Sequence, residues 1–141
     1  MPTASTAIRV LCADDHRLMR EGIARIVGVQ PDMTVVAQAS DGEQAVAQFL
    51  KYRPDVTLMD LEMPTMTGIE ATRRLKALAP GLKVVVLTVF EEPAAILEAV
   101  CAGADGYLVK KARARELLDG IQAVADGGSP LTSNVARKVL E

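Results

Sequence analysis

Residues 56–68 have the sequence VTLMDLEMPTMTG. An apolar run with β-branched residues ends in the carboxylate of Asp60, and Pro64 and Gly68 then interrupt regular structure. This pattern predicts a buried strand that delivers one acidic side chain to the edge of a sheet. Three other apolar runs also end in polar groups: residues 8–13 precede Asp14 and Asp15, residues 84–87 precede Thr88, and residues 107–109 precede Lys110.

Strand and helix patterns alternate along the chain. The predicted strands are residues 8–13, 34–39, 56–59, 83–87 and 106–109, and the predicted helices are 16–27, 42–52, 68–79, 93–102 and 115–126. Three of the strands are nearly all apolar, so both of their faces should be covered. Right-handed crossovers then predict a doubly wound α/β fold with a five-stranded parallel sheet. Sites in such sheets form beyond the carboxyl ends of the strands, where the polar groups fall.

Composition limits the class of protein. The 141 residues are 50% hydrophobic and 3% aromatic with no Trp, so the core must be aliphatic, which suits a sheet between helices. The net charge of −2 gives no case for nucleic-acid binding by this chain. No apolar stretch approaches the ~20 residues that span a bilayer, so no membrane contact is expected. Cys12 and Cys101 are far apart, and we expect both to be reduced in a cytoplasmic protein.

The polar groups suggest phosphoryl-transfer chemistry. Asp14, Asp15 and Asp60 would repel one another in one pocket, and at least one pKa should rise. A divalent cation removes that problem, and oxygen ligands suit Mg2+. Lys110 adds a positive charge for a phosphate oxygen, and Thr88 adds a hydroxyl donor. A carboxylate can itself become an aspartyl phosphate, a reaction that needs mostly positioning and charge neutralisation.

Each of these residues also has an ordinary structural interpretation. Asp15 could cap the following helix, Lys110 and Lys111 could be a solvated charge pair, and Thr88 could simply end a strand. Any one of them alone favours the structural interpretation. Their occurrence together, in order and on alternating strand–helix units, favours a shared site.

Four segments carry a more specific signal: VLCADDH at 10–16, DLEMPTMTG at 60–68, VLT at 86–88 and AGADGYLVK at 102–110. In these segments the chain resembles the receiver domain of bacterial two-component response regulators, in family order and spacing over about 120 residues. Residues 14–16, 20–22, 106–110 and 127–129 are most similar to the subfamily that carries a LuxR-type helix-turn-helix. The resemblance implies a flavodoxin-like fold with strand order 2-1-3-4-5 and five helices on both faces.

The resemblance also implies the cation ligands. Asp60 matches the phosphoacceptor and, with Asp15, a direct Mg2+ ligand, whereas Asp14 acts through water. The backbone carbonyl of Glu62 matches the third protein ligand. His16 belongs to the subfamily pattern and is expected to be neither a ligand nor a phosphate carrier.

The remaining implied roles concern the phosphate and the switch. Lys110 matches the phosphate-binding lysine, and Thr88 matches the hydroxyl that moves onto the phosphoryl group. Tyr107 matches the aromatic residue that turns inward, with plain core filling as the alternative. Many receivers have a proline with a cis bond after the lysine, whereas this chain has Lys111.

Two residues are expected to tune hydrolysis of the aspartyl phosphate. Glu62 and Phe90 each lie two residues beyond a site residue, at the rim of the site. Glu62 would add negative charge, and Phe90 would crowd the path of an attacking water. We therefore expect slow hydrolysis.

The expected function is a phosphorylation-dependent switch and not an enzyme. A sensor histidine kinase would be the donor, homodimerisation the response, and DNA would be contacted through a C-terminal domain outside this chain. Residues 1–128 would form the receiver, and residues 129–141 would begin a linker helix toward that domain.

Three other functional classes are alternatives to this switch. A pseudo-receiver would be an interaction domain that phosphorylation does not regulate. An aspartate-dependent phosphatase typically has Asp two residues after its nucleophile, where this chain has Glu62, and no cap domain fits the length. A flavin or nucleotide module would need a Gly- or Ser/Thr-rich loop after the first strand, where this chain has acidic residues.

Overall fold

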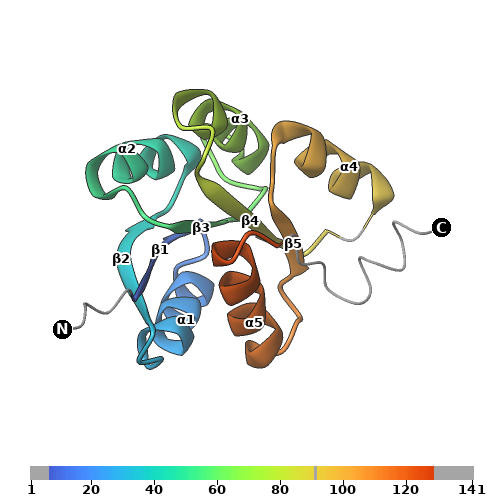
Figure 1. The fold of residues 1–141 in the computed structure, drawn as a ribbon. Helices are drawn as coiled ribbons and strands as arrows, with labels where there is room; N and C mark the ends of the chain where they lie inside the picture. The colour runs from blue at the N-terminus through green and yellow to red at the C-terminus, as the bar shows by residue number, and fades with distance from the viewer. Residues whose placement is uncertain (1–6, 91, 129–141) are drawn as a thin grey trace.

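A five-stranded parallel sheet lies between two layers of helices in the computed structural model, which describes residues 7–90 and 92–128 (Figure 1). The strands are β1 (Ile8–Ala13), β2 (Met33–Ala39), β3 (Val56–Met59), β4 (Lys83–Thr88) and β5 (Gly106–Val109), in the order β2-β1-β3-β4-β5. The helices are α1 (Arg17–Gly28), α2 (Gly42–Tyr52), α3 (Gly68–Leu78), α4 (Pro93–Ala102) and α5 (Ala114–Ala125). The predicted fold class and strand order are confirmed. The predicted linker over residues 129–141 lies outside the described residues.

The register of the sheet determines which side chains meet at its carboxyl edge. β1 pairs in parallel with both β2 and β3, and Ala13 faces Met59 across the β1–β3 pair. The residues that follow, Asp14 and Asp60, therefore leave neighbouring strands at the same level. On the far side, Thr88 faces Val109, so the end of β4 lies beside the residue that follows β5.

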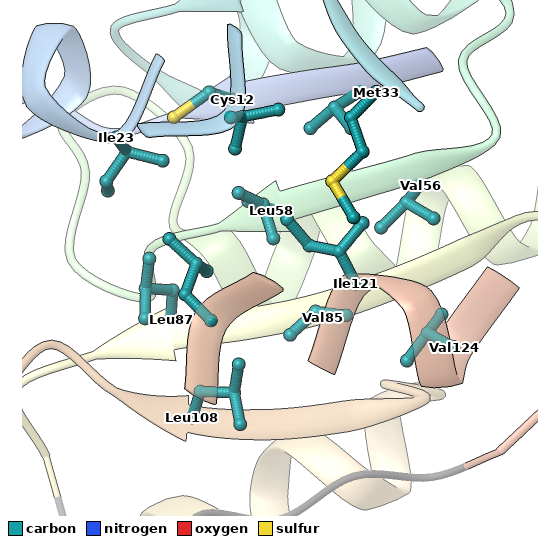
Figure 2. Close-up of a cluster of buried hydrophobic side chains, with 13 residues drawn as sticks. Cys12, Ile23, Met33, Val56, Leu58, Val85, Leu87, Leu108, Ile121 and Val124 are labelled. Atoms are coloured by element: carbon teal, nitrogen blue, oxygen red, sulfur yellow. The ribbon is translucent and has the colours of Figure 1, made fainter. Parts of the chain in front are cut away.

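The aliphatic core is divided by the sheet. α1 and α5 cover one face, where Ile23 and Ile121 belong to the same core cluster as Leu58 of the central strand (Figure 2). α2, α3 and α4 cover the other face, as the layers in Figure 1 show. β3 and β4 contain the buried residues Val56, Leu58, Val85 and Val86, consistent with strands covered on both sides.

Side-chain caps determine where two helices begin. The Asp41 carboxylate accepts a hydrogen bond from the Gln44 amide at 2.8 Å, at the start of α2. The Thr67 hydroxyl accepts one from the Glu70 amide at 3.2 Å, at the start of α3. Each such cap stabilises a helix by roughly 1 kcal/mol. The Thr67 cap also determines where the loop after Asp60 ends.

A half-buried ion pair joins α3 to the amino ends of β4 and β5. The Lys76 ammonium lies 2.7 Å from the Asp105 carboxylate and also donates to the Leu82 carbonyl. The same carboxylate accepts a hydrogen bond from the Val84 amide at 2.9 Å. This contact holds the helix that follows the site loop against two strands that contribute to the site.

Thr57, in the middle of β3, is a defect in this packing. Its side chain is 1% exposed, and its hydroxyl has no hydrogen-bond partner among the described residues. We expect Thr57→Val to raise the free energy of unfolding by about 1 kcal/mol, because it removes a buried polar group that makes no bond. Denaturant unfolding of the two proteins measures this difference.

Thr72→Val is the matched control for this prediction. Thr72 is equally buried, but its hydroxyl donates to the Gly68 carbonyl at 2.7 Å. The control should therefore gain no stability. An unchanged or lower stability of Thr57→Val would contradict the prediction, and equal gains in both variants would assign the effect to hydrophobicity alone.

Candidate functional site

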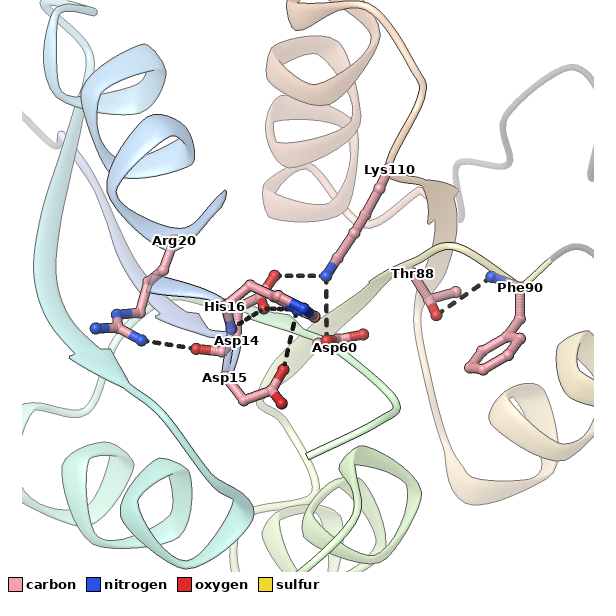
Figure 3. Close-up of polar contacts among 8 residues, drawn as sticks. All are labelled: Asp14, Asp15, His16, Arg20, Asp60, Thr88, Phe90 and Lys110. Carbon is pink, nitrogen blue, oxygen red and sulfur yellow. Dashed lines mark hydrogen bonds and ion pairs between the residues drawn. The ribbon is translucent and has the colours of Figure 1, made fainter. Parts of the chain in front are cut away.

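Four strands deliver polar side chains to one pocket at the carboxyl edge of the sheet (Figure 3). Asp14 and Asp15 follow β1, Asp60 follows β3, Thr88 ends β4, and Lys110 follows β5. Asp14, Asp60 and Thr88 are 2%, 5% and 0% exposed. Asp15 is more accessible, with 34% of its side chain exposed. The structure thus brings together the side chains that the sequence placed at strand ends.

Lys110 links the two buried carboxylates. Its ammonium nitrogen lies 2.7 Å from one oxygen of Asp14 and 3.1 Å from one oxygen of Asp60. Burial by itself would lower the pKa of Lys110, but the two carboxylates outweigh burial and raise it. Lys110 is therefore a permanent positive charge in the pocket.

The pocket still carries excess negative charge. When ionised, the carboxylates of Asp14, Asp15 and Asp60 outnumber the single Lys110 ammonium. Burial raises the pKa of Asp60, the Lys110 charge opposes that rise, and the Asp14 charge adds to it. A bound divalent cation would balance this charge.

The start of α1 is held by Asp14 and not by Asp15. The Asp14 carboxylate accepts a hydrogen bond from the His16 amide at 2.8 Å, and the Arg20 guanidinium donates to the Asp14 carbonyl at 2.8 Å. His16 occupies the N-cap position and makes no side-chain cap bond. The alternative in which Asp15 caps this helix is therefore wrong, and its carboxylate instead lies 3.3 Å from the His16 ring nitrogen.

The loop after Asp60 is tightly constrained. The Glu62 backbone amide donates to the Asp60 carboxylate, and the Gly68 amide donates to the Leu61 carbonyl at 2.9 Å. A Cβ atom at Gly68 would clash with the Asp60 carbonyl oxygen, so glycine is required there. Thr65 has a φ of 71°, in the left-handed region, which lets the chain reverse direction. The backbone of this loop therefore fixes the position of the Asp60 carboxylate.

Phe90 connects Thr88 to Tyr107 through its backbone. The Thr88 hydroxyl accepts a hydrogen bond from the Phe90 amide at 3.4 Å. The Tyr107 hydroxyl donates to the Phe90 carbonyl at 2.8 Å, and Tyr107 is 1% exposed. Tyr107 therefore points inward in this structure. Glu62 and Phe90 both line a groove of about 440 Å3 beside α3 and α4, and their predicted role at the rim of the site stays a prediction.

The donor atoms suit a hard divalent cation. Asp14, Asp15, His16 and Asp60 each offer one ligand atom, and these atoms all lie within 4.8 Å of one another. Three of the four donors are carboxylate oxygens, the ligand type that Mg2+ prefers.

Sequence reasoning missed the proximity of His16, and it missed the contact of Arg20 with the Asp14 backbone. A signal for Arg20 was present, since a cation one helical turn after the acidic pair can reach back to it.

The sequence matches the response regulator receiver domain over residues 10–122, so the chain belongs to that family. The transcriptional regulatory protein DegU of Brevibacillus brevis is 40% identical over 134 residues, which cover 95% of this chain and 57% of DegU. LiaR of Bacillus subtilis is 43% identical over 133 residues, which cover 94% of this chain and 63% of LiaR. The chain therefore spans less than two thirds of the length of these relatives.

Solved structures support the same family assignment. A LuxR-family response regulator from Aurantimonas sp. SI85-9A1 has a TM-score of 0.90 and 32% identity, and the match covers 94% of each chain. The isolated receiver domain of RcsB from Salmonella enterica serovar Typhimurium, solved in the presence of the phosphomimetic BeF3−, has a TM-score of 0.85 and 25% identity, and the match covers 93% of this chain and 97% of that chain. The chain is thus a receiver domain similar to those of LuxR-type regulators.

None of its described helices is both long and apolar enough to cross a bilayer.

Asp60→Asn is expected to raise the free energy of unfolding at neutral pH in the absence of divalent cations. Because the pKa of Asp60 is raised above its ordinary 3.8, the ionised carboxylate is less favourable in the folded chain than in the unfolded one. This cost is fully present above the folded-state pKa and is lost as the pH falls below 3.8. Unfolding curves across this pH range should therefore converge in acid.

Adding Mg2+ should make the wild type more stable to unfolding than Asp60→Asn. A cation that binds the folded chain stabilises it by about 2.7 kcal/mol at 100 times its Kd, and the variant should gain less. Asp32→Asn, which removes an exposed carboxylate before β2, is the control and should respond to Mg2+ like the wild type. Equal stabilisation of wild type and Asp60→Asn by Mg2+ would contradict a cation site at Asp60.

Proposed function

We propose that this receiver is a switch that accepts a phosphoryl group on Asp60 from a sensor histidine kinase in the presence of Mg2+. The observation that carries this proposal is the Asp60 carboxylate, buried at the carboxyl edge of the sheet and 3.1 Å from the Lys110 ammonium. A nucleophile of this kind needs fixed positioning and neutralisation of the incoming charge. Membership of the receiver family supports the same chemistry.

The transfer step is a displacement at phosphorus. One oxygen of Asp60 attacks the phosphorus of a phosphohistidine, the P–N bond breaks, and its electron pair and a proton remain on the leaving imidazole. The product is an acyl phosphate on Asp60, and Lys110 is close enough to neutralise one phosphate oxygen. Mg2+, when bound by Asp14, Asp15, Asp60 and the Glu62 carbonyl, would offset charge on the other phosphate oxygens.

Thr88 and Tyr107 are proposed to couple phosphorylation of Asp60 to a change in the segment that leads into α4. Both bond to the backbone of Phe90, Thr88 at its amide and Tyr107 at its carbonyl. The 3.4 Å contact made by Thr88 is long for a hydrogen bond, so a phosphate oxygen would compete for this side chain at little cost. Movement of Thr88 would release the Phe90 amide and change the segment that leads into α4. Phosphorylation would thus shift a population between two arrangements.

The proposed output is dimerisation and control of a DNA-binding domain outside this chain. DegU and LiaR are named transcriptional regulatory proteins, which supports such an output. On α4, Leu97 and Val100 are 64% and 52% exposed, so this helix offers an apolar surface that a second copy could cover.

A groove of about 620 Å3 between α1 and α5, bordered by Lys110, offers an apolar surface beside Asp60 for a kinase. We propose a cytoplasmic location for such a protein.

Intact-mass measurement after incubation with acetyl phosphate and Mg2+ tests the proposal. The wild type should gain one phosphoryl group, because Asp60 is the buried nucleophile beside Lys110. Asp60→Asn, the wild type with excess chelator, and wild type without acetyl phosphate are the controls and should gain none. A wild type that stays unmodified under all conditions would favour an interaction domain that phosphorylation does not regulate.

Phe90→Ala and Glu62→Ala should each shorten the half-life of the acyl phosphate. Both side chains line the groove beside α3 and α4. We propose that water approaches the acyl phosphate from this side, so removing bulk or negative charge should ease attack. We expect about a two- to tenfold effect, which is up to ~1.4 kcal/mol in the barrier. Loss of the phosphoryl mass with time measures it. Val89→Ala, which truncates an exposed neighbour of Phe90, should leave the half-life unchanged. A half-life that neither Phe90→Ala nor Glu62→Ala shortens would refute the proposed tuning.

A further inference from the structure

Arg20 lies in the first turn of α1 and reaches back to the edge of the pocket, and the proposed function gives it no role. It begins the segment 20–22, one of the segments that resemble the LuxR-type subfamily. Its guanidinium Nη1 donates to the Asp14 backbone carbonyl at 2.8 Å (Figure 3). Its Nε donates to the side-chain oxygen of Gln38 in β2 at 3.1 Å. One side chain on α1 therefore bonds both to the residue after β1 and to the neighbouring strand.

The backbone carbonyl that Arg20 contacts belongs to the peptide bond between Asp14 and Asp15. A peptide unit is planar, so a bond that holds this carbonyl also fixes the Asp15 amide and the direction in which the Asp15 side chain leaves the backbone. Asp14 has further anchors, because its amide donates to the Ala39 carbonyl at 3.0 Å and the residue is 2% exposed. The one ion-pair partner of Asp15 among the described residues is the His16 ring, which is 76% exposed. Asp15 therefore depends on the backbone for its position.

We propose that Arg20 is a positioning residue for phosphoryl transfer, which acts through the Asp14–Asp15 peptide to hold the Asp15 carboxylate where the cation needs it. The inference rests on the proposed function and adds a residue outside the acidic pocket that controls it. Groups that orient a metal ligand without touching the metal typically contribute about 10–100-fold to metal affinity. Arg20 suits this role because its guanidinium is a planar fork, so one side chain makes two bonds in a fixed geometry.

The charge of Arg20 acts in the opposite direction. A guanidinium near the pocket repels a divalent cation, so its removal would by electrostatics alone strengthen cation binding. This charge is felt at the end of β1: burial raises the pKa of the Cys12 thiol to about 12, and the Arg20 charge opposes that rise. Loss of Arg20 should therefore weaken Mg2+ binding if the residue positions Asp15, and strengthen it if the residue acts only through its charge. The sign of the effect separates the two roles.

Calorimetric titration of the untagged chain with Mg2+, at one fixed pH and ionic strength, measures this sign. Arg20→Met keeps an unbranched apolar stem but removes both donors, and we expect its Mg2+ affinity to fall about tenfold. Arg17→Met is the matched control, because Arg17 lies in the same turn of α1 and pairs with Glu21 on the surface. It removes one positive charge and no bond to the Asp14 backbone, so this control should bind Mg2+ at least as tightly as the wild type.

Gln38→Met tests the fork without changing any charge. Gln38 is exposed on the edge strand β2, and loss of its side-chain oxygen leaves the guanidinium with the Asp14 carbonyl alone. Its Mg2+ affinity should fall, but by less than that of Arg20→Met. Because both substitutions act through the same guanidinium, the double variant should bind Mg2+ no more weakly than Arg20→Met. Gln38→Met also decides the question if Arg20→Met does not fold.

Phosphorylation by acetyl phosphate provides a second readout. The loop after Asp60 is held by its own backbone bonds, such as that from the Gly68 amide to the Leu61 carbonyl. Arg20→Met should therefore keep a rate at saturating Mg2+ within about twofold of the wild type, while the Mg2+ concentration that gives half of this rate should rise about tenfold. A merely structural role would lower the free energy of unfolding and leave this Mg2+ concentration unchanged.

The positioning role and the proposed function fail in different ways. An Arg20→Met chain with Mg2+ affinity equal to or above the wild-type value, or a Gln38→Met chain that binds Mg2+ like the wild type, would overturn the positioning role alone. A wild type that binds Mg2+ but gains no phosphoryl group would reject the proposed function, and calorimetry would still decide whether Arg20 positions Asp15. A wild type that binds no Mg2+ would reject both.

Discussion

Asp14 and Asp60 are buried side by side at the carboxyl edge of the sheet, and the Lys110 ammonium contacts both of them. The parallel register imposes this arrangement, because Ala13 and Met59 are paired and the acidic residues follow directly. Burying two carboxylates next to each other is unfavourable unless cations offset the charge. The folded chain therefore concentrates unfavourable negative charge at one edge of the sheet, which the proposed cation would reduce.

The surroundings of this charge cluster are rigid on one side and adjustable on the other. Around Asp60, the bonds from Glu62 and Gly68 and the lack of space for a Cβ at Gly68 hold the backbone in one path. Around Thr88, the contact to Phe90 is long and the Phe90 side chain is half-buried at a groove. Such a division would let the proposed nucleophile stay fixed if the segment before α4 changed conformation on phosphorylation.

The fold followed from the sequence because its signals are local and repeated. Apolar runs and helical spacing located the ten elements of the described residues, and the predicted ends differ from the observed ones by one residue at most. Side-chain contacts between distant segments were not accessible in this way. Lys76 has the spacing of an exposed helix residue, yet it reaches Asp105 across 29 positions. The place of His16 among the carboxylates depends on how α1 begins, and the sequence suggested Asp15 as the cap, whereas the Asp14 carboxylate accepts the His16 amide.

The inward position of Tyr107 has a practical consequence for observing the protein. The chain has no tryptophan and two tyrosines, so Tyr52 and Tyr107 dominate its ultraviolet emission over the weakly emitting phenylalanines. Tyr52 ends α2 beside Lys51, whereas Tyr107 is buried and bonded to the backbone next to the pocket. A change in that bond alters the surroundings of one of two fluorophores. The protein thus contains its own optical reporter, which requires neither a dye nor an added side chain.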